Sequence, residues 1–239
     1  MSNGLSGPPS ATSIAEVIAS MQSIDAALDD ADGLKWFNYL YLSVSLAVDA
    51  QVSGGSRFLD PAWITRLDVT FANLYFSAIR AAIVGGPDAA PPAWRPLFEN
   101  RNKPRVARIQ FAFAGMNAHI NRDLVFALLR LYQQDGFAPD QTSARFADFT
   151  SVNALLETVE AQVRPTLLVG TPLASGGHLA PLEDLIGMWG VKEARQAAWN
   201  HSQAAWNLRS LPVIQLGMLD ALDGATQFAS SALLVQVLP

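Results

Sequence analysis

Apolar side chains recur along most of this chain every three to four positions, which is the spacing of one face of an α-helix. Alternating apolar and polar positions are scarce, and no Asn-Gly or Asp-Gly turn joins two alternating runs. The pattern predicts an all-α, single-domain bundle of about seven helices around a central buried helix. The helices are expected at about residues 13–29, 34–52, 61–84, 105–134, 142–163, 181–208 and 212–235.

Composition and helix-end residues refine this outline. Residues 1–12 are rich in Ser, Gly and Pro and are expected to form a disordered tail, with residues 13–239 as one α-helical domain. Asp60 followed by Pro61 combines an N-cap with a proline at the first helical position. Asp140 or Thr142 is expected to cap the fifth helix.

The longest stretch without helical spacing is residues 85–104, which contains five of the fourteen prolines. A loop of this length in a compact domain is often a lid or a binding loop.

The predicted helix over 105–134 is apolar on nearly all sides, which is typical of a helix surrounded by others. Polar side chains in its middle must therefore lie inside the bundle, where each is costly unless it has a hydrogen-bond partner. These polar residues are Asn117, His119, Asn121, Arg122 and Asp123. The cluster is either a structural polar network or a reactive site.

His119 and Asp123 are four residues apart, so their side chains share one face of the helix. A carboxylate beside an imidazole fixes its tautomer and favours its charged form, as a general base requires. We therefore take His119 and Asp123 as candidate catalytic residues, with Asn117 and Asn121 as candidate substrate contacts. The same pair could instead supply two ligands to a metal, and His201 a third.

The segment Gly115–Leu124, read G-M-N-A-H-I-N-R-D-L, resembles the signature of an uncharacterised, largely actinobacterial family that is known only as a domain of unknown function. Segments around Trp36 and Asn38, around Trp94, and from Trp189 to Trp199 are similar to that family too. The resemblance implies a helical bacterial protein and no settled activity. Trp36, Asn38 and Trp199 join the candidate substrate contacts.

Asp68 is a further candidate substrate contact, because its polar side chain interrupts an otherwise apolar helix. It is expected either to pair with Arg66 or Arg80, or to face the same cavity as Asp123.

Composition excludes several classes of function. A net charge of -5 argues against a nucleic-acid partner, and the lack of cysteine excludes disulfides and thiolate chemistry. The chain has only three histidines, so no metal and no cofactor are expected. No signal-peptide pattern and no apolar run of about 18 residues is present, so we expect a cytoplasmic protein without a membrane partner.

The sequence thus predicts a small-molecule enzyme that acts on a largely apolar substrate in a helical-bundle cavity by His/Asp acid-base chemistry. His119 would be the acid or base and Asp123 would orient it, in a cyclase, isomerase, lyase or hydrolase type of reaction. One alternative is a metal-dependent hydrolase with His119 and Asp123 as ligands. Another is a non-catalytic ligand-binding or interaction protein whose polar cluster is structural. A homodimer is left open.

Overall fold

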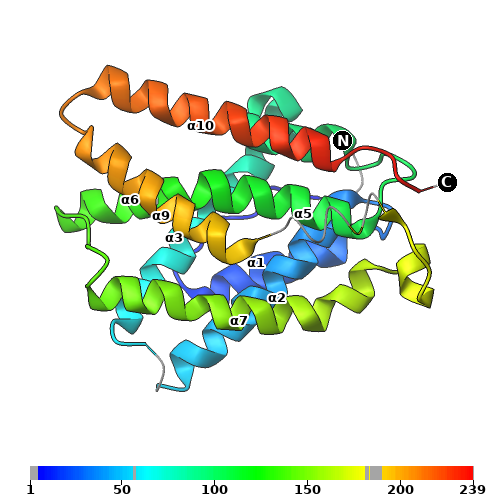
Figure 1. Ribbon diagram of the computed structural model, residues 1–239, viewed down its shortest axis with the longest axis horizontal. Coiled ribbons are helices and arrows are strands. Elements are labelled where there is room, and N and C mark those ends of the chain that lie inside the picture. The colour runs from blue at the N-terminus through cyan, green and yellow to red at the C-terminus, as the bar shows by residue number, and fades with distance from the viewer. Residues whose placement is uncertain (1–4, 56–57, 181–182, 184–189, 239) are drawn as a thin grey trace.

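The periodic segments of the sequence are helices in the computed structural model, which describes residues 5–55, 58–180, 183 and 190–238 (Figure 1). The α-helices are α1 (Ile14–Ala27), α2 (Gly33–Ser53), α3 (Pro61–Gly85), α4 (Arg95–Asn100), α5 (Arg108–Ala118), α6 (Leu124–Asp135), α7 (Ala144–Leu167), α9 (Val191–Asn207) and α10 (Pro212–Leu233). A π-helical turn, η3 (His119–Asp123), joins α5 to α6, and the short 3-10 turns are η1 (Pro87–Ala89), η2 (Pro92–Trp94) and η4 (Pro172–Ser175). Within these described ranges there is no β-strand, and the predicted all-α single-domain fold is confirmed.

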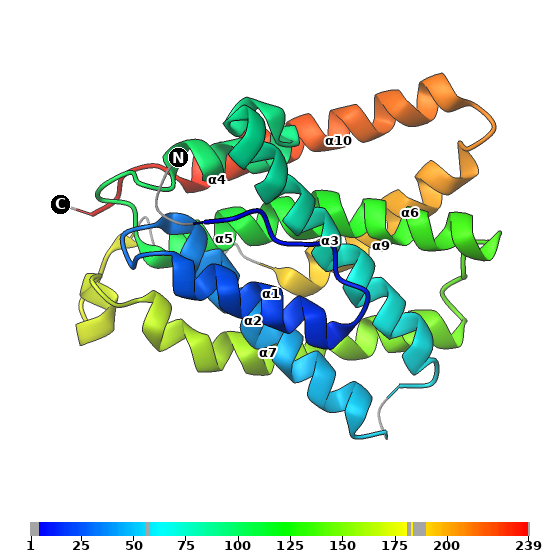
Figure 2. The same cartoon turned by 180° about the vertical axis from the view of Figure 1, so that it is seen from behind.

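The central element of the bundle is the rod formed by α5, η3 and α6 (Figure 1). α5 packs against α2 and α10, and α6 packs against α3 and α9. The view from behind shows α1, α2 and α3 on the other side of this rod (Figure 2). Every residue from Ile109 to Ala118 is buried, as expected of a helix surrounded by others.

The capping predictions are partly confirmed. The Asp60 carboxylate accepts the backbone N–H of Trp63 at 3.0 Å and starts α3. The cap of α7 is Ser143 rather than Asp140 or Thr142. Asp140 instead accepts the backbone N–H of Thr142 at 2.8 Å, in a turn just before the helix, because a short carboxylate readily bonds to the backbone two residues on.

The proline-rich segment 85–104 is mostly short helices with several side chains in the core, so the expectation of a long irregular loop is wrong. It consists mainly of η1, η2 and α4, and the side chains of Trp94 and Leu97 are fully buried. The backbone N–H of Ala93 donates to the Asp223 carboxylate of α10 at 2.7 Å. Proline is tolerated in the first turn of a helix, because the N–H groups of that turn have no partner within the helix and proline lacks this N–H.

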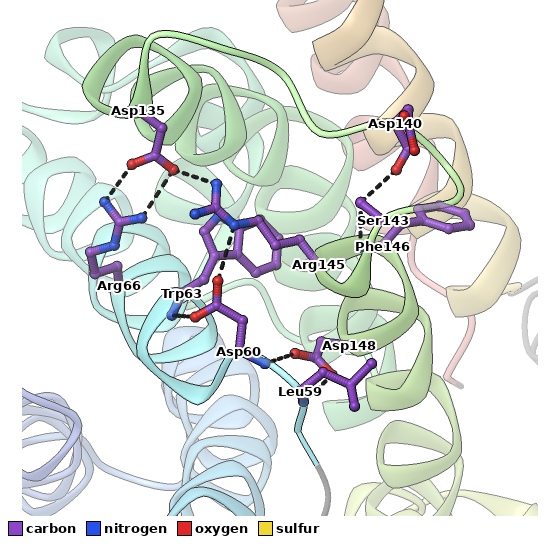
Figure 3. A network of polar contacts seen from close by, with 10 residues as sticks. All are labelled: Leu59, Asp60, Trp63, Arg66, Asp135, Asp140, Ser143, Arg145, Phe146 and Asp148. Carbon is purple, nitrogen blue, oxygen red and sulfur yellow. Dashed lines mark hydrogen bonds and ion pairs between the residues drawn. The ribbon is translucent and has the colours of Figure 1, made fainter.

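One network of ion pairs joins the ends of three helices (Figure 3). Arg66 donates twice to Asp135, at 2.9 and 3.0 Å, and Arg145 donates to both Asp135 and Asp60, at 2.7 and 3.1 Å. The Asp148 carboxylate accepts the two backbone N–H groups that precede α3, at 2.8 and 2.6 Å. These contacts fix the start of α3 to the end of α6 and the start of α7.

Residues 5–12, which composition assigns to a disordered tail, lie against α3. The Asn73 side chain both donates to and accepts from the backbone of Ala11, at 2.8 Å each, and Arg80 donates to the Pro8 carbonyl at 2.6 Å. Polar side chains on α3 therefore supply the backbone partners that a tail of this composition lacks within itself.

The predicted helix over 181–208 is observed from Val191 onward as α9. Residues 181–182 and 184–189, including Trp189, lie outside the described residues.

α3 is long and apolar enough to cross a membrane, with a mean hydropathy of 1.3 over its most apolar window, of which 44% is buried inside the protein. A core helix of a soluble protein passes the same test, so this observation alone is weak support for a membrane span.

The outer face of α10 carries exposed large apolar side chains. They are Val213, Ile214, Leu216 and Phe228. Exposed apolar patches are common at protein interaction surfaces. The homodimer left open by the sequence stays a prediction.

Two helical glycines allow a matched test of the central packing. A Cβ at Gly115 would lie 2.3 Å from the ring of Phe37, which is fully buried, whereas a Cβ at Gly224 on α10 would meet nothing within 4 Å. Gly115→Ala is expected to lower the free energy of unfolding by about 1–3 kcal/mol, because Phe37 cannot move aside. Gly224→Ala should leave it unchanged or raise it by up to about 1 kcal/mol. Urea denaturation measures both, and a harmless Gly115→Ala would refute the close approach of α5 and α2.

A candidate active site around His119

The backbone departs from an α-helix where the polar cluster lies. Over His119–Asp123 the chain forms a π turn, in which the N–H of Leu124 donates to the carbonyl of His119, five residues back. The sequence predicts one uninterrupted helix here, because no Pro or Gly marks a break within the turn. Single π turns are rare in proteins overall, and those that occur are often found at functional sites.

The Asp123 carboxylate is fully buried and accepts three hydrogen bonds. Its donors are Nδ1–H of His119 at 3.1 Å, Nη1 of Arg122 at 2.6 Å and Nε1 of Trp94 at 2.9 Å. Arg122 also donates to Asp223 of α10 at 3.0 Å. Since a carboxylate only accepts, Nδ1 of His119 carries the proton and Nε2 presents a lone pair.

The His119 ring is 1% exposed and lies among aromatic rings. It stacks on Phe71, with ring centroids 3.5 Å apart and an interplanar angle of 8°, and its centroid is 4.4 Å from that of Tyr41. Burial lowers the pKa of His119, and the opposing hydrogen bond and charge of Asp123 do not compensate for it. The sequence suggests that Asp123 favours the charged imidazole, but desolvation outweighs that effect and favours the neutral ring.

His119 lies on the wall of a cavity of about 60 Å³ between α2, α3, α7, α9 and the central rod. The walls are mostly apolar, and the polar residues that line it are Tyr41, Asp68, His119 and Arg195. Three buried atoms there lack any hydrogen-bond partner within the described part of the chain: the Tyr41 hydroxyl, Oδ2 of Asp68 and Nε2 of His119. Each such atom costs about 1–3 kcal/mol unless a water or a ligand bonds to it, and three of the six such atoms among the described residues lie around this cavity.

Asp68 faces this cavity and has neither of the two partners considered from the sequence. Arg66 pairs with Asp135, and Arg80 donates to the Pro8 carbonyl. Burial, with a smaller contribution from the charge of Asp49, raises the pKa of Asp68 to about 7. A carboxyl group with this pKa can both give and take a proton near neutral pH.

Tyr41 and Arg195 also line the cavity, and sequence reasoning did not single them out. Burial raises the pKa of Tyr41 well above its ordinary value, and the charges of Asp68 and Asp123 add to this effect. In the sequence, both residues lie in segments that resemble the family: Tyr41 in the segment around Trp36, and Arg195 in the segment from Trp189 to Trp199.

Asn117 and Asn121 do not line the cavity. Asn117 donates to the Thr226 carbonyl at 3.0 Å and to the Ser230 hydroxyl at 2.9 Å, both on α10. Asn121 donates to the Asn117 side chain at 2.7 Å. In this arrangement the two amides fasten the central rod to α10.

Asn38, Trp36 and Trp199 also lie away from the cavity walls. Asn38 donates to the Met21 carbonyl at 2.9 Å and so joins α2 to α1. Trp36 donates to the Asp30 carbonyl at 3.1 Å. Trp199 is fully buried in a cluster of aromatic rings. Its neighbours are Trp63, Tyr132, Phe146 and Phe149.

For the metal alternative, the ligand set is incomplete. Across the residues that the structure describes, no group of three or more His, Asp or Glu side chains is placed to hold an ion. Both Asp123 oxygens already accept hydrogen bonds, so a metal at this position would compete with Trp94, Arg122 and His119 for them.

A comparison with protein-family models identifies the class of this chain. Residues 14–236 match the model of a family of unknown function, DUF5995. The chain belongs to this family, which agrees with the resemblance seen in the sequence and brings no activity with it. No significant match was found among curated proteins or among solved structures.

Asp68→Asn is expected to stabilise the protein at pH 8 and to lose this advantage at pH 4. The unfolded chain releases the Asp68 proton near 3.8, whereas the folded protein keeps it up to about 7. The folded state binds more protons between these values, so the free energy of unfolding falls as pH rises through the window, by at most about 4 kcal/mol. The amide does not titrate and avoids this fall.

Urea denaturation of both proteins across this pH range measures the difference. The control is Asp140→Asn, because hydrogen bonds from Thr142 lower the pKa of exposed Asp140. That variant should have the opposite sign and lose stability at neutral pH. Equal pH dependence of wild type and Asp68→Asn would contradict the burial of Asp68.

Asp123→Asn is expected to lower the pKa of His119 further, because it removes the hydrogen bond and the charge that oppose desolvation. It should also destabilise the fold by roughly 3–5 kcal/mol, since Arg122 loses a buried counterion. Imidazole NMR titration and urea denaturation measure the two effects, with exposed Asp220→Asn as control. An unchanged His119 titration would show that the two side chains do not interact.

Proposed function

We propose that this protein is an enzyme that transfers protons to and from a small, largely apolar molecule bound in the His119 cavity. The observation that carries the proposal is the state of His119. Its Nδ1 is fixed by Asp123, while its Nε2 is buried at the cavity without a partner among the described residues. This is the arrangement that makes a neutral imidazole a general base.

Two further groups give the cavity both an acid and a hydrogen-bond donor. Asp68, with a pKa near 7, can return a proton or receive one, and the Tyr41 hydroxyl stays protonated and can donate to a developing negative charge. Pairs of titratable groups in different environments are typical of acid and base roles. His119 would then be the base, Asp68 the acid and Tyr41 the electrostatic partner.

The size and walls of the cavity restrict the substrate. Its volume of about 60 Å³ is well below the ~150 Å³ of a cavity that takes up benzene, so only a small molecule or its reacting end fits without movement. The walls away from the polar groups are aliphatic or aromatic, which favours an apolar body. Isomerisation, elimination, cyclisation and hydrolysis all fit a proton transfer in such a site.

The two alternatives differ from this proposal in what they require. A metal-dependent hydrolase requires a metal ion bound to His119 and Asp123, with further ligands besides these two. A non-catalytic binding protein requires only the cavity, so His119 could be replaced without losing more than affinity.

Solvent deuterium exchange tests the proposal without a known substrate. The purified protein is incubated in D2O with a panel of small ketones, esters and lactones, and proton NMR follows exchange and conversion. The wild type is expected to exchange or convert members of the panel. His119→Gln, which cannot accept a proton as a base, should slow this by roughly 10²–10⁴-fold. The control, Arg164→Gln, breaks an exposed ion pair on α7 and should be fully active.

Three results would overturn the proposal. Activity that survives His119→Gln would place the chemistry elsewhere. Binding of panel members without exchange or conversion would favour the non-catalytic alternative. Activity that appears only after addition of Zn²⁺ would favour the metal-dependent hydrolase.

A further inference from the structure

Arg195 is a buried cation that forms no ion pair with any of the described residues. It is 6% exposed, and it is the only arginine within the described residues that is classed as buried. Four of the partly buried arginines have carboxylate partners: Arg66 and Arg145 pair with Asp135, Arg101 with Asp32, and Arg122 with Asp123 and Asp223. No carboxylate lies within ion-pair distance of Arg195 in the described part of the chain.

The contacts of Arg195 position its guanidinium without neutralising it. Nε donates to Oδ1 of Asn153 at 2.8 Å, and Nη2 donates to the Phe149 carbonyl at 2.6 Å. The guanidinium carbon lies 4.2 Å from the centre of the Phe149 ring. Nη1 has no hydrogen-bond partner among the described residues. Burial lowers the pKa of Arg195 to about 10, so the group stays charged at neutral pH.

Arg195 is one of the residues that line the His119 cavity. Leaving a fixed, desolvated cation unpaired is costly, and a ligand that brings an anion removes this cost. From these contacts we infer that Arg195 binds the carboxylate of a small apolar monocarboxylic acid, whose hydrocarbon part extends into the cavity towards His119. The claim that this acid is the substrate rests on the proposed function. The inference adds the chemical class of that substrate.

Charge and geometry favour a carboxylate over a phosphate. The cavity also contains Asp68, so a singly charged anion beside Arg195 is better tolerated than a dianion. The rest of the lining is apolar. Examples are Val48 on α2, Phe71 on α3 and Leu156 on α7.

A binding series tests this inference independently of any reaction. Acetate, propionate, butyrate and hexanoate are compared with their amides and with inorganic phosphate, by titration of the purified protein at constant ionic strength. NMR of the Arg195 Nε–H and the thermal midpoint report binding. Carboxylates should bind better than the matched amides by at least tenfold. Affinity should rise roughly fourfold per added methylene until the cavity is filled.

Variants separate the anion site from the cavity. Arg195→Gln should abolish the preference for carboxylate over amide, whereas Arg164→Gln should preserve it. Asp68→Asn leaves the hydrogen bonds of Arg195 intact, so it provides a second test of the anion site if Arg195→Gln does not fold. At pH 8, above the pKa of Asp68 of about 7, it should strengthen binding of the carboxylates and leave the amides unchanged.

The outcomes distinguish the two proposals. Equal binding of acids and amides would overturn the role of Arg195 and leave acid-base chemistry in the cavity intact. Tighter binding of phosphate than of butyrate would overturn the carboxylate assignment. Carboxylate binding that persists in Arg195→Gln would place the anion site elsewhere. Selective carboxylate binding without turnover would support the inference while counting against the enzyme.

Discussion

The rest of the structure depends on the burial of one carboxylate. Asp123 has no access to water, so its charge must be met by protein donors, and these come from η3 (His119), from Arg122 and from Trp94 in the proline-rich segment. Arg122 extends the network to Asp223, which also accepts a backbone N–H from η2. One charge therefore fixes the central rod, the proline-rich segment and α10 relative to one another.

The two ring nitrogens of His119 differ in their hydrogen bonds. Nδ1 is bonded to Asp123, whereas Nε2 has no partner among the described residues. Asp123 accepts hydrogen bonds from His119, Arg122 and Trp94, whereas at the cavity Tyr41, Asp68 and His119 each have a buried atom without a partner among the described residues. A structural network would gain stability by pairing these atoms, for instance with one more serine or asparagine. Their persistence is typical of sites whose groups are arranged for a ligand at some cost to stability.

The sequence was sufficient for features that depend on near neighbours. Helical spacing gave most helices, and the four-residue interval between His119 and Asp123 predicted their contact. The sequence did not predict contacts in which the second residue comes from a distant segment of the chain. Asn117 is bound by α10 and Trp199 is enclosed by aromatic rings, while Tyr41 and Arg195 reach the cavity from α2 and α9. A helical pattern tells that one side of a helix is buried, but not which helix covers it.

The geometry of this site depends on the number of residues in the π turn as well as on their side chains. A π turn contains about one residue more than an α-helical turn, so α6 is rotated by about 100° from where an unbroken helix would place it. Deleting a single residue between Ala118 and Leu124 would hardly change composition or hydropathy. It would nevertheless turn the apolar face of α6 away from α3 and α9 and break the alignment of His119 with Asp123.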